Sequence, residues 1–131
     1  MHCFEMQDWV TIRGATYVAT LSQSEPAWVD LAGYRDVVVW TEVKEMSTTS
    51  GATLVLSLQT APTQDETLFT ETVAAFSATP GVTATVIHRD TAGVPIARWL
   101  RWQLGGQGSI TSTSDITFRM WIAAAGKGAQ R

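Results

Sequence analysis

Apolar and polar side chains alternate with a period of two along two neighbouring stretches of the chain, residues 36–46 and 52–60. In each stretch we expect every second residue to lie in the core, and these residues are Val37, Val39, Thr41, Val43, Leu54, Leu56 and Leu58. A period of two is typical of a strand that buries one face. Ser47 and Gly51 delimit a polar turn between the two stretches. We therefore predict two strands here, paired as an antiparallel hairpin.

Further stretches rich in β-branched and aromatic residues are separated by short segments of turn-forming residues. They cover residues 9–21, 28–31, 68–76, 82–89, 96–104 and 116–122. In residues 68–76, Ala74 and Ala75 would also suit a helix, but the threonines favour a strand. About eight short strands without a convincing helix predict an all-β fold, an antiparallel two-sheet β-sandwich of jelly-roll-like type.

The stretch 96–104 carries the densest set of large side chains, and residues 116–122 follow it as the second strand of an expected hairpin. The residues of these strands that we expect in the core are Leu100, Trp102, Leu104, Ile116, Phe118, Met120 and Ile122. The alternate positions Trp99, Arg101, Arg119 and Trp121 would then share one outer face. Tryptophan and arginine are enriched where interfaces carry their binding energy, so we expect a contact surface here. Two other readings stay open: a face covered by a loop or by the N-terminal segment, and a sugar-binding platform of tryptophan rings.

A chain of 131 residues suits a single domain, which we place at 1–131. Residues 1–8 lack a pattern and are expected to form an N-terminal arm, and residues 125–131 a flexible tail. The apolar fraction of 45% indicates a folded protein, and the low charged fraction of 16% favours an oligomer or a component of an assembly.

The charge balance argues against a nucleic-acid partner, and the lack of long apolar runs argues against a membrane partner. A net charge of −3 argues against a general nucleic-acid binder, which needs a basic surface to neutralise phosphates. No segment has the length and apolar character of a signal peptide or a membrane span. We therefore expect a cytoplasmic protein with no membrane partner, unless it leaves the cell inside a larger particle.

The sequence offers no set of residues with the spacing of a catalytic or metal site. Cys3 is the single cysteine, and His2 and His88 lie far apart. His88 has Asp90 nearby but no nucleophile to activate, and the carboxylates are scattered along the chain. The glycine-rich residues 105–108 precede Ser and Thr residues and not a helix, which a phosphate loop would need. We expect no enzyme, no cofactor and no bound metal.

The second half of the chain, about residues 52–123, contains a particular order of strand types. Its parts are Leu54-Val55-Leu56-Ser57-Leu58-Gln59-Thr60, a loop with Asp65, an aromatic at Phe69, Arg98-Trp99-Leu100-Arg101-Trp102 and Ile116-Thr117-Phe118-Arg119-Met120-Trp121-Ile122. This order resembles that of small β-sandwich structural proteins of tailed bacteriophages.

This resemblance implies a non-enzymatic virion component, such as a head decoration or accessory protein. Proteins of this kind bind an assembled shell and often form trimers, so the expected partners are a protein shell and further copies of the chain. The expected location is the virion, after synthesis in the host cytoplasm. A carbohydrate-binding β-sandwich module that uses exposed tryptophans is the alternative that the residues leave open.

Overall fold

The computed structural model describes residues 2–13, 21–47, 52–87, 96–108 and 115–126. Within these ranges the chain forms nine strands and two short 3-10 helices. In chain order they are β1 (His2–Arg13), β2 (Leu21–Ser22), η1 (Glu25–Ala27), β3 (Val29–Asp30), β4 (Asp36–Ser47), β5 (Ala52–Ala61), η2 (Glu66–Leu68), β6 (Thr70–Ser77), β7 (Gly81–Ile87), β8 (Trp99–Gly108) and β9 (Asp115–Ala125).

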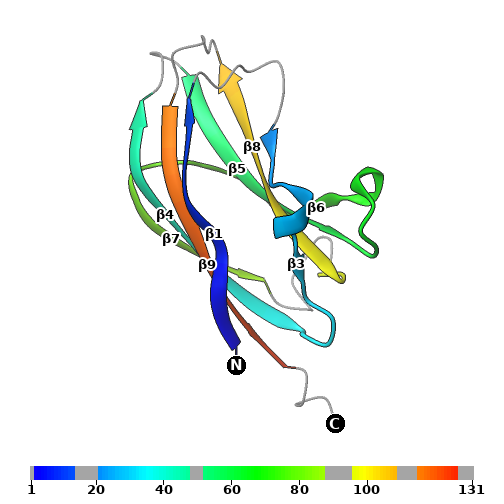
Figure 1. The fold of residues 1–131 in the computed structure, drawn as a ribbon. Coiled ribbons are helices and arrows are strands. Elements are labelled where there is room, and N and C mark those ends of the chain that lie inside the picture. The colour runs from blue at the N-terminus through cyan, green and yellow to red at the C-terminus, as the bar shows by residue number, and fades with distance from the viewer. Residues whose placement is uncertain (1, 14–20, 48–51, 88–95, 109–114, 127–131) are drawn as a thin grey trace.

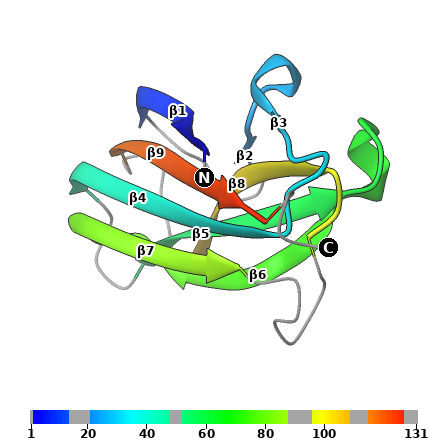
Figure 2. The same ribbon diagram turned by 90° about the horizontal axis from the view of Figure 1, so that it is seen from below.

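Two antiparallel sheets pack face to face (Figures 1 and 2). Sheet A has the order β1-β9-β4-β7, and sheet B has the order β2-β8-β5-β6, with β3 also paired to β8. Consecutive long strands pass repeatedly from one sheet to the other, which is the connectivity of a jelly roll. The predicted all-β, two-sheet sandwich is therefore confirmed.

The core lies between the sheets and includes the alternate residues that the sequence pattern selects. The buried residues that were predicted from the pattern are Val37, Val39, Thr41, Val43, Leu54, Leu56, Leu58, Leu100, Trp102, Leu104, Ile116, Phe118, Met120 and Ile122. The rings of Trp102 from sheet B and Phe118 from sheet A meet edge to face, with centroids 5.1 Å apart. Contacts of this kind hold the two layers together.

Both predicted hairpins are wrong. The strand β4 pairs with β9 and β7 in sheet A, whereas β5 pairs with β8 and β6 in sheet B. Likewise β8 and β9 belong to different sheets. Alternation shows which face of a strand is buried but not which strand lies beside it. In this fold β4 and β5, and likewise β8 and β9, lie in opposite sheets, and their apolar faces are buried in the core between the sheets.

The segment 1–8 is not a separate arm, because residues 2–13 form β1. This strand pairs with β9 from His2 opposite Ala124 to Arg13 opposite Asp115. Its register shifts twice, between Glu5 and Gln7 and again between Gln7 and Val10. Shifts of this kind interrupt the alternation of apolar and polar residues, which is why the sequence lacks a strand pattern here. At the other end β9 runs to Ala125, and the part of the predicted tail at 127–131 lies outside the described residues.

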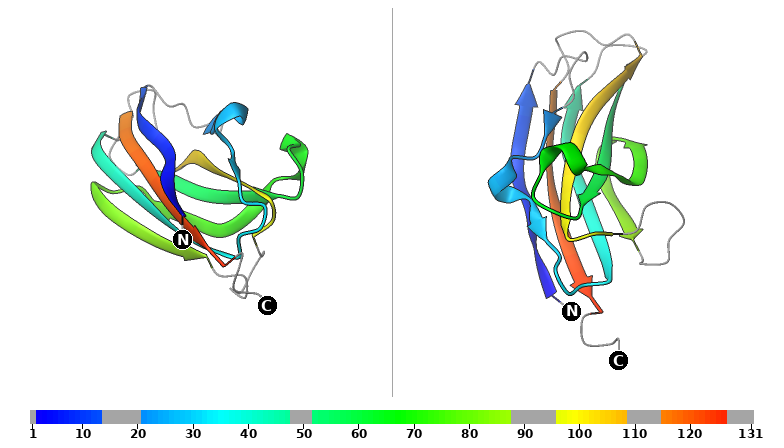
Figure 3. Two further views of the ribbon diagram at one scale, coloured as in Figure 1. Left: turned by 60° about the horizontal axis from the view of Figure 1, so that its bottom comes forward. Right: turned by 90° about the vertical axis from the view of Figure 1, so that its right-hand side faces the viewer.

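A buried glutamine connects the two sheets at the β1 side of the sandwich. Gln23 is 3% exposed, and its Nε2 donates to the carbonyl oxygen of Met6 in sheet A at 2.7 Å. Its backbone N donates to the carbonyl oxygen of Trp102 in sheet B at 3.0 Å, and its Oε1 accepts from the Trp102 N at 3.4 Å. These bonds fix the segment that leads into η1. The two 3-10 helices then project from the outer side of sheet B, on either side of β8 (Figure 3).

Candidate functional site

The four residues predicted to form one contact face lie on opposite sides of the sandwich. Trp99 and Arg101 belong to β8 and point outward from sheet B. Arg119 and Trp121 belong to β9 and point outward from sheet A. The alternation within each strand was predicted correctly, but the shared face depended on a hairpin that does not form. The structure therefore presents two separate candidate surfaces.

The outer face of sheet A carries most of the exposed apolar side chains in the part of the chain that the structure describes. Five of the seven large hydrophobic residues that are exposed lie there. We call this surface the tryptophan face and define it by Trp9, Trp40, Val82, Val86 and Trp121. The three tryptophans are 38–40% exposed, and Val82 is 65% exposed. An exposed apolar surface of this kind is typical of a binding site.

The register of sheet A makes the tryptophan face continuous across three strands. Trp40 of β4 lies opposite Trp121 of β9 on one side and opposite Ala84 of β7 on the other. One row further along, Val38 lies between Ala123 and Val86. Side chains directly opposite each other on neighbouring strands lie close together. The face is thus an uninterrupted apolar band in these two rows.

The band ends at a salt bridge between Arg119 and Glu42. Arg119 Nε donates to Glu42 Oε1 at 2.9 Å, and both side chains are about one-third exposed. The guanidinium also lies over the ring of Trp9, 4.7 Å from its centroid, and 5.9 Å from that of Trp121. Cation–π contacts of this kind bring the charge into the aromatic surface. Arg119 is therefore paired within the chain and does not need a partner protein for its charge.

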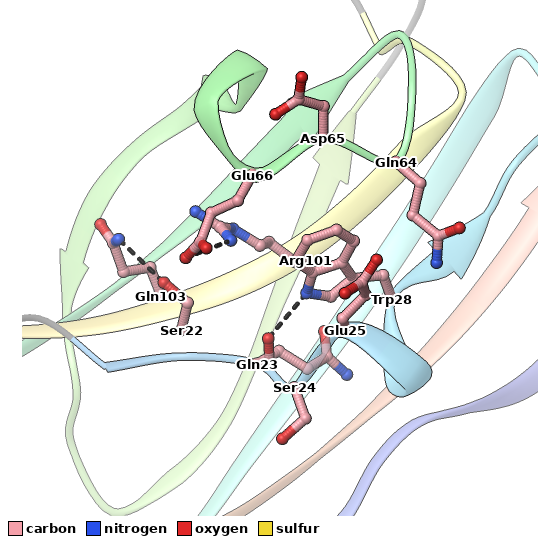
Figure 4. A pocket seen from close by; sticks show the side chains of 10 residues that line it. All are labelled: Ser22, Gln23, Ser24, Glu25, Trp28, Gln64, Asp65, Glu66, Arg101 and Gln103. Atoms are coloured by element: carbon pink, nitrogen blue, oxygen red, sulfur yellow. Dashed lines mark hydrogen bonds and ion pairs between the residues drawn. The ribbon is translucent and has the colours of Figure 1, made fainter.

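The outer face of sheet B holds an open pocket between η1 and η2, with β8 as its floor (Figure 4). Its volume is about 670 Å³. The lining residues are mainly polar and comprise Ser22, Gln23, Ser24, Glu25, Trp28, Gln64, Asp65, Glu66, Arg101 and Gln103. We call this the Arg101 pocket.

Arg101 is buried beneath the pocket, although the sequence predicts it as an exposed contact residue. Only 4% of its surface is accessible, because Phe69 and Trp28 cover the guanidinium with ring centroids 4.1 and 5.3 Å away. Its Nε donates to Gln59 Oε1 at 2.8 Å. Burial lowers the pKa of Arg101, and the carboxylate of Glu66 opposes this change. The group stays protonated, since arginine does not lose its proton in proteins.

The reading in which a loop covers this face therefore holds for Arg101. Trp99, at the end of the same strand, is half-buried, and the guanidinium of Arg98 lies 5.5 Å from its ring centroid. Sequence reasoning did not select Trp28 and Phe69, which come from distant segments and meet edge to face at 4.7 Å. It also left out Trp9 and Trp40, although the outward position of Trp40 follows from the alternation in residues 36–46.

In the described ranges no group of three or more His, Cys, Asp or Glu side chains is placed to hold a metal ion. Cys3 is exposed, and the candidate base His88 lies outside the described residues. Among these same residues no helix has the length and apolar character that crossing a bilayer requires. Comparison with known proteins finds no family model that matches the chain and no similar curated protein.

Proposed function

We propose that this chain is a non-enzymatic structural protein of a phage or phage-like particle. In this proposal it binds an assembled protein shell, and further copies of itself, through the tryptophan face. The observation that carries the proposal is the gathering of Trp9, Trp40 and Trp121 on one face of sheet A, each with 38–40% of its surface exposed. Tryptophan and arginine dominate the energetic centres of protein interfaces.

The charge distribution of the tryptophan face supports a protein partner. The centre of an interface is depleted of charges, because a charge that loses water without gaining a partner is costly. Here Arg119 and Glu42, two of the charged groups next to the aromatic rings, already pair with each other. Lys44 is also charged, and its Nζ lies 5.8 Å from the centroid of the Trp9 ring. A partner can therefore cover the centre of the face without leaving Arg119 or Glu42 unpaired.

The fold and the sequence pattern support the phage assignment. Jelly rolls are a common architecture of viral capsid proteins. The order of strand types in residues 52–123 resembles that of phage structural proteins, and the charged fraction is only 16%. A protein that binds only the assembled shell stabilises that shell by mass action, without any chemical step.

Sedimentation velocity of the purified chain, alone and mixed with empty shells of tailed phages, tests this proposal. We expect self-association or co-sedimentation that the Trp40→Thr/Trp121→Thr variant loses. Leu68→Thr is the matched control, because Leu68 is exposed to a similar degree but lies outside the tryptophan face. A wild-type chain that stays monomeric and binds no shell contradicts the proposal. The proposal is also contradicted if Leu68→Thr loses self-association or shell binding to the same degree as Trp40→Thr/Trp121→Thr.

A carbohydrate-binding module is the second candidate, because flat tryptophan rings on a rigid sheet can also stack against sugar rings. Titration with soluble polysaccharides, followed by tryptophan fluorescence, separates the two. A fluorescence response that Trp40→Thr/Trp121→Thr abolishes, in a chain that is monomeric and binds no shell, would favour this candidate over the assembly protein.

A further inference from the structure

The Arg101 pocket lies on the side of the sandwich opposite the tryptophan face and contains a buried hydrogen-bond donor without an acceptor. Arg101 Nη1 is inaccessible to water and makes no hydrogen bond. The nearest carboxylate oxygen, Glu66 Oε1, lies 3.8 Å away, beyond hydrogen-bond distance. A buried charged donor left in this state costs free energy, and such groups are rare in folded proteins. The pocket therefore lacks an acceptor at this point.

The guanidinium is held in place, whereas the carboxylate nearest to it belongs to a largely exposed side chain. Phe69, Trp28 and the bond to Gln59 hold Arg101. Glu66 reaches over the guanidinium from η2 (Figure 4), and its side chain is 76% exposed. A ligand can displace Glu66 without disturbing the core, and it then meets a donor that is already oriented.

The other groups of the pocket make charged ligands poor partners for Arg101. Three carboxylates line it, those of Glu25, Asp65 and Glu66, against the single positive charge of Arg101. An anion that approached Arg101 would be repelled by the carboxylates. A cation would be attracted by the carboxylates, but it could not supply the acceptor that Arg101 Nη1 lacks.

A hydroxyl group suits both the guanidinium and the carboxylates of the pocket, because it donates one hydrogen bond and accepts others. It can accept from Arg101 Nη1 and donate to a carboxylate of Glu25 or Glu66. The amide of Gln64 and the hydroxyl of Ser24 add further donors and acceptors around the rim. Gln103 and Ser22 also line the pocket, where Gln103 Nε2 donates to Ser22 Oγ at 3.1 Å. The volume of about 670 Å³ falls within the usual range for small-molecule sites, roughly 300–1,000 Å³, and accommodates a small saccharide.

We infer that the Arg101 pocket binds a neutral, hydroxyl-rich ligand of the carbohydrate class, with Arg101 as the central donor and the carboxylates of Glu25 and Glu66 as acceptors. This site is independent of the tryptophan face and of the proposed shell contact.

Two-dimensional NMR of the ¹⁵N-labelled chain, titrated with a panel of neutral mono- and disaccharides, tests the inference. We expect a saturable response at the backbone amides of residues 22–25, 64–66 and 103. Because the ligand is uncharged, the affinity should stay constant when salt is raised, since screening acts only between charges. Matched titrations with glucuronic acid and with lysine amide test the anionic and cationic alternatives.

Two substitutions at the rim replace exposed side chains, so they test ligand binding in a chain that still folds. Gln64→Ala and Ser24→Ala change exposed side chains, and we expect each to weaken saccharide binding severalfold. Arg101→Lys keeps the charge but loses the planar donor geometry, and we expect a loss of tenfold or more, about 1.4 kcal/mol. Trp40→Thr/Trp121→Thr should leave this binding unchanged while it abolishes the proposed shell contact.

Three outcomes overturn the inference. The first is no response to any neutral saccharide, and the second is binding of glucuronic acid or lysine amide alone, with an affinity that falls as salt rises. The third is a saccharide response confined to amides near Trp40 and Trp121, which would move sugar binding to the tryptophan face.

Discussion

Trp40 and Trp121 lie directly opposite each other on the neighbouring strands β4 and β9, and both point away from the core. Each keeps roughly two-fifths of its surface in contact with water. Large apolar rings in such positions stabilise the fold less than buried ones, because the part of their surface that stays in water contributes no transfer free energy. The structure thus separates the residues of the tryptophan face from those that hold the sandwich together.

Replacing both Trp40 and Trp121 by threonine should therefore leave the fold intact. Threonine suits a strand, and surface substitutions usually change stability little, so we expect the free energy of unfolding to fall by less than about 1 kcal/mol. Light scattering of concentrated solutions should decrease, because an exposed apolar band promotes association. Urea unfolding measures the first effect. A loss of several kcal/mol would show that the two rings belong to the core.

The faces of the long strands could be predicted from the sequence because alternation is local information. Leu100 and Trp102 are buried as expected, and Trp121 points outward as expected. The partner of each strand could not be predicted in the same way. Two strands with one apolar face each are equally consistent with a hairpin and with opposite sheets, and the choice depends on the whole set of strands.

Phe118 is a residue for which the sequence prediction and the structure agree, and its truncation should be severe. It is completely buried, and its ring contacts that of Trp102 across the core. Removing such a ring loses its transfer free energy and leaves a cavity, so Phe118→Ala should cost about 3–5 kcal/mol. Urea unfolding at neutral pH gives the value. Val82→Thr, at a highly exposed position, should change stability by less than about 0.5 kcal/mol.

The burial of Arg101 shows a second limit of sequence reasoning. Its strand position predicts an outward side chain, and the direction is correct. Whether an outward side chain meets water depends on what covers the sheet, here Trp28 and Phe69. These residues are distant in sequence and carry no pattern that connects them to Arg101. A contact between three separate segments cannot be predicted from the amino-acid composition.

Gln23 should contribute to stability more than a glutamine usually does, because its side chain bridges the sheets. Gln23→Leu keeps a similar volume but leaves the Met6 carbonyl oxygen and the Trp102 N without this partner. A buried group without a partner costs about 1–3 kcal/mol, which is the loss of unfolding free energy that we expect. Exchange of the Trp102 amide hydrogen should also accelerate.

The control for Gln23 is Gln64→Ala, at an exposed loop position, where we expect almost no change in stability. If Gln23→Leu were as stable as the wild type, the side-chain bonds between the sheets would contribute nothing, and packing alone would close this side of the sandwich.

The ion pair of Asp30 and Arg98 makes a prediction about pH. Arg98 Nε and Nη2 donate to the two carboxylate oxygens of Asp30, each at 3.0 Å, and the backbone N of Ala32 adds a third bond at 3.0 Å. The bonds from Arg98, followed by that from Ala32, lower the pKa of Asp30. Arg98→Gln should raise this pKa toward the ordinary value of about 3.9 but not fully, because the Ala32 bond remains.

A carboxyl with a lower pKa in the folded than in the unfolded state stabilises the fold above its unfolded pKa, and this contribution disappears as the pH falls through the folded pKa. Asp30→Asn should therefore lower the melting temperature at neutral pH and lose this effect as the pH falls through the folded-state pKa of Asp30. Carbon-13 NMR of the carboxyl groups measures the pKa directly. Asp65 is the internal control, because its pKa is lowered by hydrogen bonds from Thr67 and should not respond to Arg98→Gln. A pKa of Asp30 that is the same in the wild type and in Arg98→Gln would show that the ion pair does not persist in solution.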